Sequence, residues 1–155
     1  MPAIAALWEE AVRAAFAPLL PPDHPLPSRH DAEPRLHQGL TQPDVRLAVE
    51  ERDGRVLGSA GFGASRDPDA PDDTAELRTL FVHPSHWRAG VGSALVGHVR
   101  DECRGMGFEE VTVWSFAAND RANAFYDRHG FGADGEQRRE ETWAGILEIR
   151  LRRGL

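Results

Sequence analysis

Two glycines at the start of an expected helix are the first residues of this sequence that could do chemistry. Residues 80–95 read LFVHPSHWRAGVGSAL: an apolar run, a turn, then Gly90 and Gly92 opening a helical pattern. Small residues there let backbone N–H groups converge on a ligand, and a helix N-terminus adds roughly half a positive charge. Such a loop suits a pyrophosphate. An ordinary helix start, with glycines that allow close packing of the helix, explains the segment equally well. It is not a dinucleotide fingerprint, because Leu95 occupies the position of the third glycine.

A second segment, residues 119–131, reads NDRANAFYDRHGF. It resembles, position by position, the N-x-x-A-x-x-F-Y-x-x-x-G-F signature of the GNAT superfamily of acyl-CoA-dependent N-acyltransferases. The glycine loop lies the right distance upstream, and the resemblance covers residues 45–151. The two motifs are specific together, and neither is specific alone. The chain departs from the family at Trp87, where Gln or Arg is usual, and in having no strand before its first expected helix. Because the phosphate contacts are mostly backbone, we expect binding to survive the tryptophan.

The resemblance implies a role for each matching position. The strand Leu80, Phe81, Val82 would hydrogen-bond the pantetheine arm of acetyl-CoA through its backbone. Asn119 would help to hold the end of that arm. The amides that would wrap the pyrophosphate belong to Trp87, Arg88, Ala89, Gly90, Val91, Gly92 and Ser93.

Two residues would carry the chemistry. Tyr126 would reprotonate the departing thiolate, and Glu76, four residues before Leu80, would deprotonate the amine directly or through water. The residue types agree with these roles, because a phenol with a pKa of about 10 can donate to a thiolate with a pKa of about 8–9. Tyr126 is the only tyrosine, and the alternative for it is a core residue. Strand alternation places Glu76 on the side of Leu80 and Val82. The alternative for Glu76 is an exposed carboxylate paired with Arg78.

Other candidate sites are weaker. His83 and His86 could form half of a metal site, but no further ligand lies at a suitable spacing, so we read them as turn residues and expect no metal. Four aspartates within residues 67–73 lack the pattern of a calcium loop and are read as a solvated loop that could attract a cationic amine. Cys103 falls on an apolar helical stripe, which favours packing over nucleophilic chemistry.

Composition limits the classes that remain. The 155 residues fit one domain, and the net charge of −7 argues against nucleic-acid binding. The chain contains no lysine, which excludes the phosphate-loop lysine and Schiff-base chemistry. A single cysteine, no long apolar run and no basic-then-apolar start predict a cytoplasmic protein without a membrane span.

Hydrophobic periodicity places these motifs on a fold. The pattern predicts helices over 4–16, 31–40, 90–104 and 120–129, with Pro34 in the first turn of the second helix. It predicts strands over 45–50, 55–63, 76–82, 110–116, 136–141 and 143–151, with Asp53-Gly54 as a hairpin turn. A helix between strands 76–82 and 110–116 implies a right-handed parallel crossover. The prediction is therefore a single α/β (α+β-like) domain over 1–155, with one mixed, mostly antiparallel sheet flanked by helices.

The function expected from these observations is transfer of an acetyl group from acetyl-CoA to a primary amine by direct attack. A non-catalytic acyl-CoA-binding sensor on the same fold is the alternative, and an interaction domain that binds no CoA is a third interpretation. The acceptor stays open among small amines, antibiotics, amino acids and protein N-termini. A homodimer is compatible with the sequence.

Overall fold

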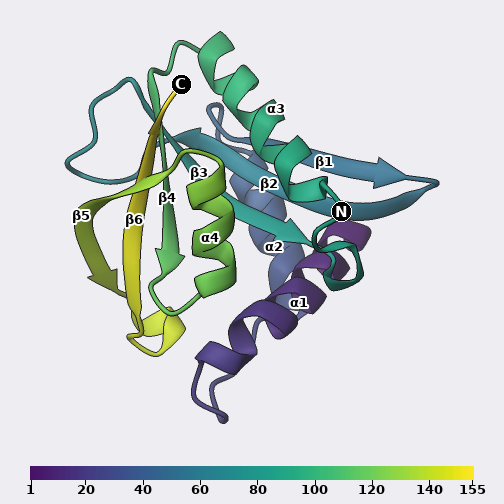
Figure 1. Ribbon diagram of the computed structural model, residues 1–155. Helices are drawn as coiled ribbons and strands as arrows, with labels where there is room; N and C mark the ends of the chain where they lie inside the picture. Colours follow the sequence, from purple (N-terminus) through teal and green to yellow (C-terminus); the bar gives the residue numbers. More distant parts are fainter.

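A computed structural model describes all 155 residues as a six-stranded sheet with helices on both faces (Figure 1). The helices are α1 (Pro2–Phe16), α2 (Arg29–Leu40), α3 (Val91–Gly105) and α4 (Asp120–Arg128). The strands are β1 (Arg46–Arg52), β2 (Arg55–Ala64), β3 (Thr74–Val82), β4 (Glu110–Phe116), β5 (Gly132–Arg139) and β6 (Leu147–Gly154). Helices α3 and α4 cover one face of the sheet, and α1 and α2 cover the other. None of the helices has the length and apolar character needed to cross a membrane.

The strand order is β1-β2-β3-β4-β6-β5, and every neighbouring pair is antiparallel except β3 with β4. This confirms the predicted mixed, mostly antiparallel sheet. The parallel pair is short: only Thr74–Glu76 register with Glu110–Thr112. Beyond these residues β3 and β4 separate, so the sheet opens in its middle.

A bulge in β3 changes which face its side chains occupy. Cα partners run regularly from Val82 opposite Gly58 to Thr79 opposite Gly61, but Leu77 then lies opposite Phe62, which leaves Arg78 as an extra residue. A bulge reverses the alternation of faces along a strand. Leu77 and Leu80 therefore both pack into the larger core under α3.

The bulge corrects one prediction. Glu76 does not share a face with Leu80 and Val82, because the extra residue lies between them. Glu76 instead points to the face covered by α1, where Phe81 contacts Trp8.

The larger core lies between the sheet and α3 and α4, and it includes the stripe on α3 that the sequence predicted. Val91, Leu95, Val99 and Cys103 are all buried there. Burial raises the pKa of the Cys103 thiol to about 11, which fits packing rather than nucleophilic chemistry. A second, small cluster joins α1 to α2 and consists of Ile4, Ala5, Ala32 and Leu36.

Several element boundaries differ from the prediction, and the starts of three elements are instructive. Helix α2 begins at Arg29 because Ser28 and Asp31 form a reciprocal capping box, so Pro34 is the sixth helical residue and not part of the first turn. Strand β5 begins at Gly132, well before the predicted start, because this edge strand is almost entirely exposed and shows no apolar alternation. Trp143 lies in a short 3-10 turn, and β6 starts only at Leu147. The hairpin turn is as predicted, with positive φ at Asp53 and Gly54.

Candidate active site

The opening between β3 and β4 is the mouth of a large cleft. Its volume is about 1540 Å³, and side chains from α1, β3, the start of α3, β4, α4 and the β5–β6 connection line it. This is more than a single small ligand needs. The cleft contains Glu76, Tyr126 and most of the residues predicted to bind the cofactor.

Backbone amides converge where α3 begins. Gly90 caps the helix with φ of 81°, and Arg88 also has a positive φ, so the loop turns its N–H groups inward. The N–H groups of Trp87 and Ala89 bond to carbonyls of the preceding turn. The first helical residues have no carbonyl four positions earlier to bond, and Ala94 is the first whose N–H reaches one, that of Gly90. The amides left without a backbone acceptor are those of Arg88, Gly90, Val91, Gly92 and Ser93.

Two residues of β3 also direct backbone groups into the cleft. The N–H of His83 donates to the carbonyl of Leu57 at 2.8 Å, which fixes the alternation of the antiparallel ladder. Residues opposite each other bond in every second pair, so the backbone groups of Phe81 face β2, and those of Leu80 and Val82 face the opening. The N–H and carbonyl of Leu80 and the N–H of Val82 are thus available to an extended ligand, whereas the carbonyl of Val82 has a partner in Trp87.

Trp87 has a role of its own in the loop. Its indole N–H donates to the carbonyl of Val82 at 3.0 Å, which ties the loop to β3. The guanidinium of Arg121, on α4, stacks over the indole ring at 3.2 Å from its centroid. Burial, and secondly the charge of Arg88, lower the pKa of Arg121. The loop therefore has two arginines beside it.

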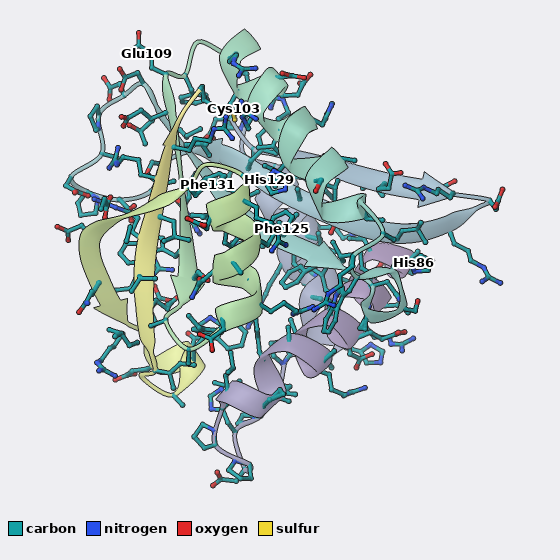
Figure 2. All side chains as sticks on the ribbon, in the orientation of Figure 1. His86, Cys103, Glu109, Phe125, His129 and Phe131 are labelled. Carbon is teal, nitrogen blue, oxygen red and sulfur yellow. The ribbon has the colours of Figure 1, made fainter.

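Helix α4 places Asn119 and Tyr126 on the cleft. Asn119 caps the helix, its side-chain oxygen accepting the N–H of Ala122 at 3.2 Å. Tyr126 is only 7% exposed, and its ring makes edge contacts with Phe125, its neighbour on α4, and with Phe131, in the turn between α4 and β5. Figure 2 labels these two phenylalanines. Burial raises the pKa of Tyr126 well above its ordinary value, so the phenol is protonated at neutral pH.

Glu76 is held in an ion pair. Its carboxylate accepts hydrogen bonds from Nη2, Nε and the backbone N–H of Arg66, at 2.6, 3.0 and 3.0 Å, and the residue is 2% exposed. Burial alone would raise the pKa of Glu76, but the hydrogen bonds and charge of Arg66 outweigh it and lower that pKa. The carboxylate is therefore buried and paired with Arg66. The alternative interpretation, an exposed carboxylate paired with Arg78, does not describe this residue.

Sequence reasoning missed part of the cleft. Glu148 on β6 is buried and lines it, as do aromatic side chains from α1, β4 and the β5–β6 connection. In the sequence, Glu148 alternates with the apolar Ile149, which places the Glu148 side chain on the face of the strand opposite the core. Nothing in the sequence indicated that α1 covers that face.

Taken together, a sheet opened between parallel strands and a group of free amides at a helix start form an arrangement suited to an extended ligand that bears phosphate. The acetyltransferase (GNAT) family model matches residues 6–131, and the chain belongs to this family. The predicted resemblance to this family is confirmed.

Individual relatives are distant. The chain is 28% identical over 135 residues to an uncharacterized N-acetyltransferase of Mycobacterium tuberculosis, covering 85% of this chain and 83% of that protein. It is 26% identical to the IAA acetyltransferase of Azospirillum brasilense, covering 63% of this chain and 61% of that protein, so it spans about three-fifths of that relative's length. The PaiA N-acetyltransferase of Thermoplasma acidophilum, solved in complex with coenzyme A, superposes with a TM-score of 0.76 at 12% identity over 99% of this chain and 91% of that one. At that identity the likeness shows the fold.

Proposed function

We propose that this chain is an N-acetyltransferase that moves an acetyl group from acetyl-CoA to a primary amine by direct attack. The observation that carries the proposal is one cleft bordered by free amides at the start of α3, free backbone groups on β3 and a buried phenol. The coenzyme in the Thermoplasma structure and the family membership support it.

The residues present fit acetyl-CoA as co-substrate. The amides of Arg88 and Gly90–Ser93 match the oxygens of a pyrophosphate, and the arginines near the loop complement its charge. The pantetheine arm is extended and carries amides, so it would pair with the backbone of Leu80 and Val82 as an added strand. That arrangement would bring the thioester toward Tyr126.

The chemical step requires three contributions from the protein. As the amine nitrogen bonds to the carbonyl carbon, negative charge gathers on the carbonyl oxygen, and a backbone N–H of strand 80–82 would stabilise it. As the carbon–sulfur bond breaks, Tyr126 would donate its proton to sulfur and recover one from solvent. The nitrogen would lose its proton to Glu76, directly or through water. Burial raises the pKa of Tyr126 and so makes the phenol a weaker acid, but the same burial would raise the pKa of the departing thiol and so offset this effect.

The test is in two stages. Acetyl-CoA at about 100 times its dissociation constant should stabilise the protein by roughly 2.7 kcal/mol, which a thermal-shift assay detects. A panel of amines is then tested for release of free thiol. Release with at least one amine supports the transferase, whereas a thermal shift without release from any amine would indicate an acyl-CoA sensor. Absence of a shift would overturn both functions.

A further inference from the structure

A second buried carboxylate lies in the cleft, on the face of the sheet that α1 covers. Glu148 is 5% exposed, and it lies directly opposite Phe116 in the β4–β6 ladder. Its carboxylate accepts hydrogen bonds from Nε and Nη2 of Arg138, on β5, at 3.1 and 3.3 Å. A buried carboxylate requires such a partner, because it has lost its hydration.

The ion pair of Glu148 is looser than that of Glu76. Arg138 divides its guanidinium between Glu148 and Glu140, at 3.4 Å, and also stacks over the ring of Trp114 at 4.3 Å from its centroid. Burial raises the pKa of Glu148, and Arg138 offsets only part of that effect. If a different cation reaches Glu148, Arg138 can therefore keep its contacts with Glu140 and Trp114. Arg66, in contrast, makes three short bonds to Glu76 and is held there more firmly.

An aromatic wall stands beside Glu148. Phe16 contacts Phe116 and Trp143 with ring centroids 4.9 and 5.4 Å apart, and Phe116 and Trp143 lie 5.7 Å apart. Phe81 extends the wall at 6.3 Å from Phe16. The four rings come from α1, β3, β4 and the β5–β6 connection, and all of them line the cleft. Phe16, Phe81 and Trp143 are half-buried, so each still offers surface to a ligand.

We propose that Glu148 and the aromatic wall form the acceptor subsite, and that its substrate is a primary ammonium carried on an aromatic body. The proposal rests on the proposed function, which requires an amine. The ammonium would bind Glu148 with a charge-assisted hydrogen bond, and the ring would pack on Phe16 and Trp143. Facing rings would also attract the cation itself.

Binding tests the subsite without requiring turnover. With the protein saturated with CoA, calorimetry compares 2-phenylethylamine with ethylamine, and we expect the aromatic amine to bind at least about tenfold more tightly. Glu148→Gln should weaken 2-phenylethylamine about tenfold or more, because it removes a charged hydrogen-bond acceptor. Glu136→Gln is the control: it removes a carboxylate from the exposed part of β5, outside the lining of the cleft, and should stay within about twofold of the parent.

A second variant covers a folding failure of Glu148→Gln. Arg138→Gln removes the cation that competes for Glu148, so 2-phenylethylamine should bind more tightly. Equal affinity for the two amines, or equal effects of Glu148→Gln and Glu136→Gln, would overturn the proposal, as would weaker binding by Arg138→Gln. If the expected binding pattern appears and no amine releases thiol, the transferase function fails while the subsite stands.

Discussion

Tyr126 supplies the only phenol of the chain, and the structure holds it in the protonated form that a proton donor requires. Its ring is fixed by Phe125 and Phe131, whereas no hydrogen bond within the protein holds its hydroxyl. The raised pKa keeps that hydroxyl protonated across the neutral range. A residue placed this way contributes packing through its ring and chemistry through its oxygen, so the two contributions can be separated.

Tyr126→Phe separates them. The ring and its packing remain, so the melting temperature and the affinity for acetyl-CoA should barely change. Turnover should fall by about 10²-fold or more, which is typical of a lost general acid. Both quantities are measured on the same sample. A variant that loses stability and keeps the parental rate would instead identify a core tyrosine without a catalytic role.

Glu76 makes stability depend on pH in a defined direction. Its pKa is lowered in the folded state, so its ion pair with Arg66 stabilises the protein above the ordinary pKa of about 4.5 and is lost as pH falls through the folded pKa. Glu76→Gln should therefore be less stable than the parent at pH 7, with the difference shrinking in acid. Urea unfolding at several pH values measures this, and Glu51→Gln on exposed β1 is the control.

The same variant tests Glu76 as a base. Turnover of Glu76→Gln should fall mainly below the pKa of the acceptor amine, and high pH should partly restore it, because the amine is then already neutral. An equal loss at every pH would assign Glu76 a structural role beside Arg66.

At the scale of elements, the start of α3 is the feature that binding depends on. A Cβ at Gly92 would lie 3.2 Å from the ring of Phe125, so any side chain there requires a small shift of that ring. Gly92→Asp also places a negative charge among amides that would bind pyrophosphate. We expect this variant to lose the thermal shift with acetyl-CoA. Gly92→Asn has the same size without the charge and should keep part of it. A full shift in Gly92→Asp would contradict the phosphate-loop assignment.

Most elements could be predicted from the sequence because their patterns are unambiguous. The apolar stripe on α3 and the Asp53-Gly54 turn belong to this group. The bulge in β3 could not be predicted from the sequence. Apolar residues occupy both faces of the strand near Leu80, so the pattern does not indicate which residues face the core. The local cause of the bulge is visible only in the fold: the Gly61 N–H donates to the hydroxyl of Thr79 at 3.0 Å, and a Cβ on Gly61 would lie 2.7 Å from that hydroxyl.

The candidate site was predicted in the same uneven way. The loop followed from the placement of its glycines, which is a local property, whereas the role of the strand Leu80–Val82 came only from the resemblance to the family. Arg66 and Glu148 were missed because each meets the cleft through tertiary contacts, Arg66 from a loop and Glu148 from a strand next to an edge. Charge pairs between distant segments have no periodic signature in a sequence.

At the scale of the whole molecule, β3 and β4 are joined at one end of the sheet and lie apart at the other. Arg150 on β6 is buried and bonds Asp69 of the β2–β3 loop at 2.8 Å and Asp134 of β5 at 2.7 Å. It thereby ties the loop that precedes β3 to the far side of the sheet. Past Glu76, no ladder joins β3 to β4, so the two halves of the sheet remain apart where a ligand would lie.

This arrangement predicts where acetyl-CoA protects the backbone from hydrogen exchange. The amides of Leu80, Val82 and the loop 88–93 should exchange rapidly in the free protein, because most of them have no partner. Acetyl-CoA at about 100 times its dissociation constant should slow them by up to about 100-fold. The turn at Asp53-Gly54, on the outer hairpin, should exchange at an unchanged rate. Exchange measured by NMR or mass spectrometry distinguishes this pattern from two others. Uniform slowing would indicate global stabilisation alone, and slowing confined to α1 and α2 would move the coenzyme to the other face of the sheet.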